Sequence, residues 1–187
     1  RDYIQHILNE HFHVLLARDG EEGLELAIAH IPDLIVSDIM MPKRDGISMV
    51  KELRANEKTN HIPIILLTAL DKESQVVEGY SLGVEDYITK PFSAKILSKR
   101  IENILLSRKK LWEQYSSSSD LNVYREKLIG QPWKKEFVDK VNNIVMEHLS
   151  DPEFGIDALA DALNMSTNQL FKKVKAIMNT TPYNVIV

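Results

Sequence analysis

The segment Leu34-Ile35-Val36-Ser37-Asp38-Ile39-Met40-Met41-Pro42 is the most informative indicator of how the first part of the chain folds. An apolar run ends there at a carboxylate, and two later apolar runs end at the hydroxyl of Thr68 and at Lys90-Pro91. Short apolar runs of this kind are typical of strands that are buried on both faces. Because open parallel sheets bind ligands at the carboxyl ends of their strands, we expect the three polar side chains to share one site.

A carboxylate, a hydroxyl and an ammonium at one place suit a phosphoryl group. Asp38 would be the nucleophile, Thr68 the hydrogen-bond donor and Lys90 the counter-charge. Taken singly, each residue also has an ordinary interpretation: a turn or cap residue, a strand residue and a surface lysine. The spacing of all three together favours the phosphoryl site.

Helical spacing separates these strands. Apolar residues recur every three or four positions in several segments, and a short apolar strand is expected at 13–17. Pro32 should end the second helix, and Gly83 should follow the end of the fourth. Strands that alternate with helices predict an α/β fold with a doubly wound parallel sheet. The expected helices are 3–12, 20–31, one around 49–53, 72–82, and 96–108 with an extension towards Trp112.

With Met41-Pro42 and Asp45-Gly46 behind Asp38, this constellation resembles the receiver domain of two-component response regulators. The resemblance covers roughly residues 1–110, and we assign residues 1–112 to a flavodoxin-like receiver. It implies that Asp38 accepts a phosphoryl group from the phosphohistidine of a histidine kinase, by in-line attack.

The resemblance also assigns roles to residues beside the acceptor. Ala69 leaves room for a phosphoryl oxygen next to Thr68. Tyr87 is either a core residue or the aromatic switch that turns inward when Thr68 moves towards the phosphate. The peptide bond between Lys90 and Pro91 is expected to be cis.

Receivers hold Mg²⁺ with the acceptor and with an acidic pair that ends their first strand. Here Asp38 and the backbone carbonyl of Met40 would be metal ligands, and the acidic pair would lie upstream of Arg1. We therefore expect a receiver that is truncated at its N-terminus and lacks its first strand. The alternative is a receiver without a metal site, which acts as an interaction module independently of phosphorylation.

The composition limits the class of protein further. The chain has 187 residues, a net charge of −4 and no cysteine, which excludes a disulfide framework and fits a reducing compartment. No apolar run reaches the roughly 18 residues of a membrane span, so we expect a cytoplasmic chain without membrane contact. This length suits one or two domains.

A polar run, Tyr115-Ser116-Ser117-Ser118-Ser119-Asp120, marks a linker that we place at 113–133, and residues 134–187 are expected to form an all-α unit. Its first helix carries an apolar stripe that Asp151-Pro152 ends, and His148 is expected to be packed at the edge of the core. The residues of the stripe are Phe137, Val138, Val141, Ile144, Val145, His148 and Leu149.

Two short helices follow, Ile156 to Leu163 and one that begins at Ser166, with a tight turn at Asn164-Met165 between them. Gln169 lies three residues after Ser166, as in a capping box. This layout is typical of a helix-turn-helix. With Thr181-Pro182-Tyr183 downstream, the segment resembles the first half of an AraC-type DNA-binding domain, and we expect it to be truncated at its C-terminus.

In that arrangement, Leu170, Val174 and Ile177 would face the core. The outward side chains would meet DNA, because asparagine can contact base edges and lysine can pair with phosphates. The alternative is that the lysines only solvate a helix. The expected DNA-binding residues are Ser166, Asn168, Gln169, Phe171, Lys172 and Lys175.

Together these features predict a phosphorylation-controlled, DNA-binding transcription regulator that is not an enzyme. Its expected partners are a histidine kinase, promoter DNA contacted by the helix at 166–177, and a second copy that pairs through the face at 72–108. The alternative is the C-terminal segment of a hybrid sensor histidine kinase. The order of receiver and AraC-type unit, and the basic helix that contains Lys99-Arg100, resemble such hybrids of gut Bacteroidetes.

Overall fold

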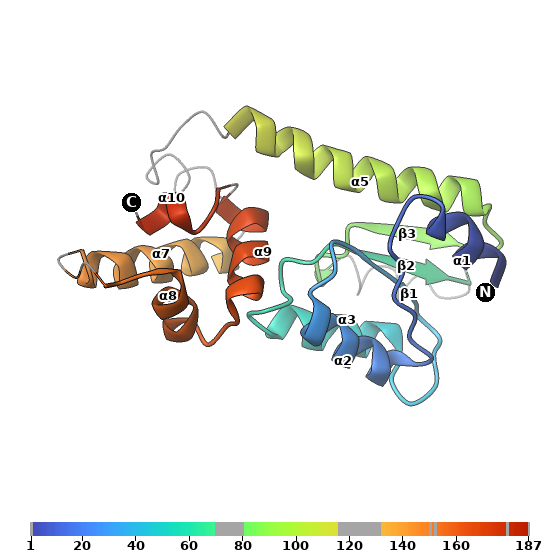
Figure 1. The fold of residues 1–187 in the computed structure, drawn as a ribbon. Helices are drawn as coiled ribbons and strands as arrows, with labels where there is room; N and C mark the ends of the chain where they lie inside the picture. The colour runs from blue at the N-terminus through green and yellow to red at the C-terminus, as the bar shows by residue number, and fades with distance from the viewer. Residues whose placement is uncertain are drawn as a thin grey trace. The chain divides into compact units, whose positions relative to one another are not determined.

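The computed structural model describes residues 2–69, 81–115, 132–149, 151, 153–178 and 180–186 (Figure 1). The chain divides into two compact units, residues 1–109 and 110–187. The helix that ends the first unit continues to Tyr115, so residues 113–115, which we predicted to begin the linker, are helical instead. None of the helices in the described part of the chain combines the length and apolarity that a membrane span requires.

The first unit contains a parallel sheet of three strands in the order β1-β2-β3. The strands are β1 (Ile35–Asp38), β2 (Ile64–Thr68) and β3 (Asp86–Thr89). Each strand ends at or next to a polar residue that the sequence singled out. The predicted parallel sheet is thus confirmed.

The helices of this unit are α1 (Asp2–Asn9), α2 (Gly20–His30), α3 (Gly46–Ala55) and α5 (Ala94–Tyr115). They agree with the predicted helices, although α1 ends earlier and α5 runs further than expected. Most of the predicted helix at 72–82 lies outside the described residues. Gly83, which was expected just past its end, has a φ of 71°.

Neighbouring residues of a strand point to opposite faces of the sheet. Both of these faces are buried here. Ile64 and Leu66 of β2 belong to a cluster that also contains residues of α2 and α3. Ile65 belongs to another cluster, with Leu8 of α1 and Leu97 of α5. Helices cover both faces of the sheet, which is the doubly wound arrangement (Figure 1).

The strand predicted at 13–17 was wrong, since the segment forms no regular structure. Leu15 and Leu16 are 42% and 45% exposed. A strand exists only where its backbone groups find a partner, and within the described sheet β1 pairs with β2 while the segment at 13–17 pairs with no strand. An apolar pattern alone does not provide such a partner.

Arg108 ties α5 to the segment before β3 through the Glu85 carboxylate, which it shares with an arginine of α3. Glu85 accepts hydrogen bonds from Arg54 of α3 at 3.3 Å, from Arg108 of α5 at 2.9 Å and from the backbone N–H of Ile64 at 2.7 Å. Arg108 also donates to the carbonyl oxygen of His61 at 3.0 Å. Burial lowers the pKa of both guanidinium groups, and the nearby Glu85 carboxylate opposes that shift.

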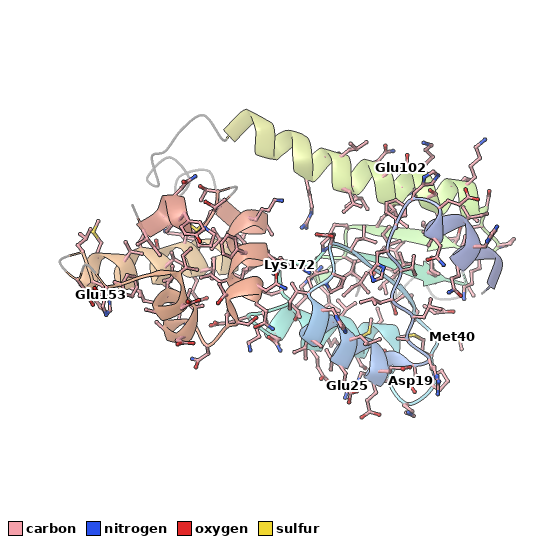
Figure 2. The ribbon with its side chains drawn as sticks, viewed as in Figure 1. Asp19, Glu25, Met40, Glu102, Glu153 and Lys172 are labelled. Carbon is pink, nitrogen blue, oxygen red and sulfur yellow. The ribbon has the colours of Figure 1, made fainter. Side chains whose placement is uncertain are left out.

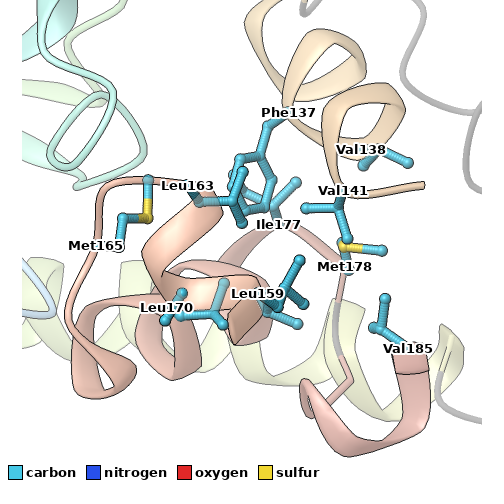
Figure 3. Packing of buried hydrophobic residues seen from close by; sticks show 12 residues of the cluster. Phe137, Val138, Val141, Leu159, Leu163, Met165, Leu170, Ile177, Met178 and Val185 are labelled. Carbon is cyan, nitrogen blue, oxygen red and sulfur yellow. The ribbon is translucent and has the colours of Figure 1, made fainter. Parts of the chain in front are cut away.

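The second unit contains α7 (Pro132–Glu147), α8 (Ile156–Ala162), α9 (Thr167–Met178) and α10 (Tyr183–Ile186). All four contribute to one apolar core, part of which Figure 3 shows. Leu170, Val174 and Ile177 are buried there, as predicted. The buried members are Phe137, Val138, Val141, Leu159, Ala160, Leu163, Met165, Leu170, Val174, Ile177, Met178 and Val185.

Local hydrogen bonds fix the turn between α8 and α9. Asn164 takes a φ of 52°, the left-handed conformation that asparagine tolerates better than most residues. The N–H of Ser166 donates to Gln169 Oε1 at 3.0 Å, and the N–H of Gln169 donates to Ser166 Oγ at 3.3 Å. The predicted capping box is therefore confirmed.

The end of α7 differs from the predicted stripe at one residue. Leu149 is 68% exposed, because the helix ends at Glu147 and the chain then leaves the helical path. His148 is packed as predicted: its Nδ1–H donates to the carbonyl oxygen of Ile144 at 2.8 Å, and its ring stacks on Phe154 at a centroid distance of 4.4 Å.

Candidate functional site

Asp38 and Lys90 meet at the carboxyl edge of the sheet. Asp38 is the last residue of β1 and Lys90 directly follows β3. The Lys90 ammonium forms an ion pair with Asp38 Oδ2, and the N–H of Met40 donates to Asp38 Oδ1 at 3.2 Å. About a third of the Asp38 side chain, 32%, is exposed, so a ligand can reach it.

Thr68 ends β2, the strand between the two, and its side chain is buried. Its carbonyl oxygen accepts a hydrogen bond from the N–H of Lys90 at 2.7 Å. On the other side of β2, the N–H of Ile39 donates to the carbonyl oxygen of Leu67 at 3.1 Å. These backbone bonds fix the three strand ends in one row, and the exposed Ala69 follows Thr68 at that edge.

Tyr87 lies in β3 opposite Leu66. Its ring packs against the apolar cluster of α2 and α3, and its hydroxyl oxygen is shielded from solvent. This inward position agrees with both interpretations of the residue, a core side chain and the inward state of a switch. The peptide bond between Lys90 and Pro91 is cis, as the resemblance implied.

The loop after Asp38 turns back sharply into α3. The N–H of Gly46 donates to the carbonyl oxygen of Ile39 at 2.8 Å. A Cβ at Gly46 would lie 2.3 Å from the carbonyl oxygen of Asp38, so a side chain there would force the acceptor strand to move. Asp45 caps α3 by accepting hydrogen bonds from the N–H and the hydroxyl of Ser48, both at 2.8 Å.

The residues present would supply part of the magnesium site that the resemblance implies, together with the acidic pair expected upstream of Arg1. Asp38 would offer a partly exposed carboxylate, and Met40, whose side chain is exposed (Figure 2), would offer its backbone carbonyl. Mg²⁺ binds proteins through one or two carboxylates and keeps several of its waters. No group of three or more acidic, histidine or cysteine side chains that could hold a metal gathers in the described residues.

In the second unit, Ser166, Asn168 and Lys175 are exposed, and Gln169, Phe171 and Lys172 are half-buried. Ser166 and Gln169 use side-chain atoms in the capping box. Phe171 packs edge to face against Tyr183 at a centroid distance of 5.8 Å. The predicted residues thus lie between the N-cap Ser166 and the third turn of α9, on its less buried side.

Lys173 is a core residue that was not predicted from the sequence. Its side chain is 2% exposed, and its ammonium lies 4.5 Å from the centroid of the Phe137 ring. The signal was present in the helical spacing, because Lys173 lies between the core positions Leu170 and Ile177 and next to Val174. Because lysine is charged, this spacing did not lead us to predict that Lys173 is buried.

The chain matches the family model described as response regulator receiver domain over residues 1–102. That match takes in more than half of the chain, and the chain therefore belongs to the response regulator receiver family. The three-stranded parallel sheet, with helices on both faces, belongs to the flavodoxin-like receiver fold. The polar strand ends lie at one edge of this sheet.

Relatives carry the names of kinases and of transcription regulators. Histidine kinase P4 of Formosa agariphila is 31% identical over 186 residues, which is 100% of this chain and 13% of that protein. The alkaline phosphatase synthesis transcriptional regulatory protein PhoP of Bacillus subtilis is 47% identical over 94 residues, which is 50% of this chain and 38% of that protein. The chain thus spans only a small part of the first of these relatives.

Solved receiver structures have the same fold. The receiver domain of the sensor histidine kinase PA1611 from Pseudomonas aeruginosa, with a magnesium ion coordinated in its active-site cleft, superposes with a TM-score of 0.51 and 30% identity. The similarity covers 56% of this chain and 86% of that chain.

Proposed function

We propose that this chain is the regulatory and DNA-binding part of a transcription regulator controlled by phosphorylation. Asp38 accepts a phosphoryl group from the phosphohistidine of a histidine kinase, and α9 binds promoter DNA. The observation that carries the first half is the ion pair of Asp38 with Lys90 at the carboxyl edge of the sheet, in a chain of the receiver family.

In this reaction an Asp38 carboxylate oxygen attacks phosphorus, an O–P bond forms and the N–P bond to the donor imidazole breaks. Lys90 exchanges its contact with the carboxylate for one with a phosphoryl oxygen and neutralises the added charge. Thr68 donates its hydroxyl to another phosphoryl oxygen. Mg²⁺, held in part by Asp38 and the Met40 carbonyl, supplies further charge neutralisation when it is bound.

The second half of the proposal rests on the less buried side of α9. That side carries Lys172 and Lys175, and the helix Thr167–Met178 contains no acidic residue. Asn168 at its start can contact a base edge, and Lys172 and Lys175 can pair with phosphates. The capping box and the left-handed turn at Asn164 support a helix-turn-helix of the AraC type, in which α9 is the second helix of the pair.

The test is labelling of the protein at its full natural length with radioactive acetyl phosphate and Mg²⁺. Asp38→Asn should abolish acid-labile labelling, because an amide is not a nucleophile. Asp33→Asn, an exposed aspartate just before β1, is the matched control and should label normally. Undiminished labelling of Asp38→Asn would show that another residue accepts the phosphoryl group.

A second candidate function is favoured by the match of the whole chain to histidine kinase P4. In that case the chain is the C-terminal part of a hybrid kinase, and the phosphohistidine lies on the same polypeptide. The full-length protein should then label Asp38 from ATP without an added kinase, at a rate that does not fall on dilution. Labelling that requires a second protein assigns the donor to a separate kinase.

A further inference from the structure

The loop that follows the acceptor, residues 39–45, is tied at its middle to the start of α2. Lys43 Nζ lies 2.7 Å from Asp19 Oδ2. Asp19 is also the N-cap of α2, and its Oδ1 accepts hydrogen bonds from the N–H groups of Glu21 and Glu22, both at 3.0 Å. One carboxylate therefore holds both the helix start and the loop.

Both partners are charged at neutral pH. The hydrogen bond from Lys43 lowers the pKa of Asp19, and the same bond raises the pKa of Lys43. Asp19 is the more enclosed partner, with a side chain that is 10% exposed, while the Lys43 side chain is 64% exposed. Lys43 therefore reaches from solvent to a carboxylate that the fold already fixes.

The loop needs this contact because its backbone is strained at Lys43. Lys43 takes a φ of 60°, in the left-handed region that residues other than glycine seldom adopt. Such conformations persist where the surrounding structure fixes them. A second constraint lies next to it: a Cβ at Gly20 would be 2.3 Å from the carbonyl oxygen of Arg44, so the loop and the start of α2 touch backbone to backbone.

The strained turn lies close to the acceptor along the chain. The N–H of Met40, in the same loop, donates to Asp38 Oδ1. The ends of the loop are fixed by the strand and by the bond from Gly46 to Ile39. The contact with Asp19 holds Lys43, and an ion pair with Glu52 of α3 holds the next residue, Arg44. Figure 2 labels Asp19 and Met40.

We propose that Asp19 and Lys43 are positioning residues for phosphoryl transfer, which hold the loop so that the Met40 backbone and the Asp38 carboxylate keep their orientation. This inference rests on the proposed role of Asp38 as the acceptor. Neither residue touches the reacting atoms. Their effect should therefore appear in the rate of phosphorylation and in the affinity for a phosphoryl mimic, more than in stability.

The experiment compares variants of the full-length protein by the rate of labelling with acetyl phosphate, the affinity for beryllofluoride and the melting temperature. Asp19→Asn keeps an N-cap acceptor but loses the charge. Lys43→Met loses the ammonium at nearly constant length. Lys95→Met, an exposed lysine on α5, is the control.

We expect Asp19→Asn and Lys43→Met to label about tenfold more slowly, since small misplacements of reacting groups can cost up to roughly a hundredfold. Their melting temperatures should stay close to that of the Lys95→Met control. Lys43→Gly should recover most of the rate, because glycine adopts a positive φ without strain. Gly20→Ala should slow labelling although the ion pair remains, because the new Cβ displaces Arg44.

The direction of the Asp19→Asn effect separates positioning from simple electrostatics. If Lys43 only attracted the anionic donor, removal of the Asp19 charge would speed labelling, and Lys43→Gly would be as slow as Lys43→Met. Either result, or rates equal to that of Lys95→Met, overturns the proposal. Failure of the underlying function would appear separately, as labelling that survives Asp38→Asn, and the proposal would fall with it.

Discussion

Lys172, Lys173 and Lys175 lie within one turn of α9, yet the fold places them in different surroundings. Lys175 is exposed and Lys172 is half-buried. Lys173 is enclosed in the core of the second unit, with its ammonium over the Phe137 ring. Contact with an aromatic face compensates part of the cost of burying the charge. We therefore expect the exposed or half-buried Lys172 and Lys175 to act differently from the buried Lys173, and substitutions can separate these roles.

Substitutions in α9 should separate these roles in the full-length protein. Lys172→Ala and Lys175→Ala should each lower the salt dependence of DNA binding by about one unit, as expected for phosphate contacts. Asn168→Ala should reduce discrimination among sequences by about 1–3 kcal/mol. Lys173→Met should leave the salt dependence unchanged and lower the stability of this unit by about 1 kcal/mol, through loss of the cation–π contact.

The measurements are DNA titrations at several salt concentrations and urea unfolding. Equal loss on all sequences from Asn168→Ala, with no effect of Lys172→Ala or Lys175→Ala, would mean that α9 is not the helix that contacts DNA. A lower salt dependence for Lys173→Met would contradict its internal position.

The start of helix α3 depends on one ionised side chain, that of Asp45. The hydrogen bond from the Ser48 N–H holds the pKa of Asp45 below its ordinary value of 3.8. A group with a lowered pKa in the folded state stabilises the fold above its ordinary pKa, and this contribution is lost as the pH falls through the lowered value. The cap should therefore matter at neutral pH and weaken in acid.

Asp45→Ala should lower the free energy of unfolding by about 1 kcal/mol at neutral pH, because it removes an N-cap acceptor. The difference from the wild type should shrink in acid, as the pH falls below 3.8 and through the lowered pKa of Asp45. Asp45→Asn should cost less, since asparagine caps helices about as well as aspartate. Urea unfolding at the two pH values measures this, and a constant difference for Asp45→Ala would refute the role of ionisation.

We expect the full-length protein to form a homodimer when it is phosphorylated. The face we predicted for pairing, 72–108, includes β3 and most of α5, and two large apolar side chains of α5, Ile96 and Leu106, are 53% and 50% exposed. Covering such side chains would favour association. A phosphoryl group on Asp38 would shift the receiver towards the pairing state.

Analytical ultracentrifugation with and without beryllofluoride measures this. The mimic should shift the protein from monomer to dimer, and Asp38→Asn should not respond. Ile96→Asp should weaken the dimer without changing the rate of labelling from acetyl phosphate. A monomer at high concentration in the presence of the mimic would count against pairing.

Most elements and the polar strand ends could be predicted from the sequence. Apolar runs and helical spacing are local signals, so β1, β2, β3 and most helices agree with prediction, as do the capping box at Ser166 and the cis bond before Pro91. The contact of Asp38 with Lys90 also followed, because parallel strands bring their carboxyl ends to one edge whatever the details of packing.

Contacts between residues of distant segments could not be predicted and emerge from the three-dimensional packing. Three features each depend on whether a segment remote in the sequence provides a partner. They are the absence of a strand at 13–17, the burial of Lys173 and the pairing of Asp19 with Lys43. Gly20 shows the reason most clearly: its lack of a side chain matters because the backbone of Arg44 lies against it. Local patterns encode how a segment folds, whereas close packing between segments fixes what each side chain touches.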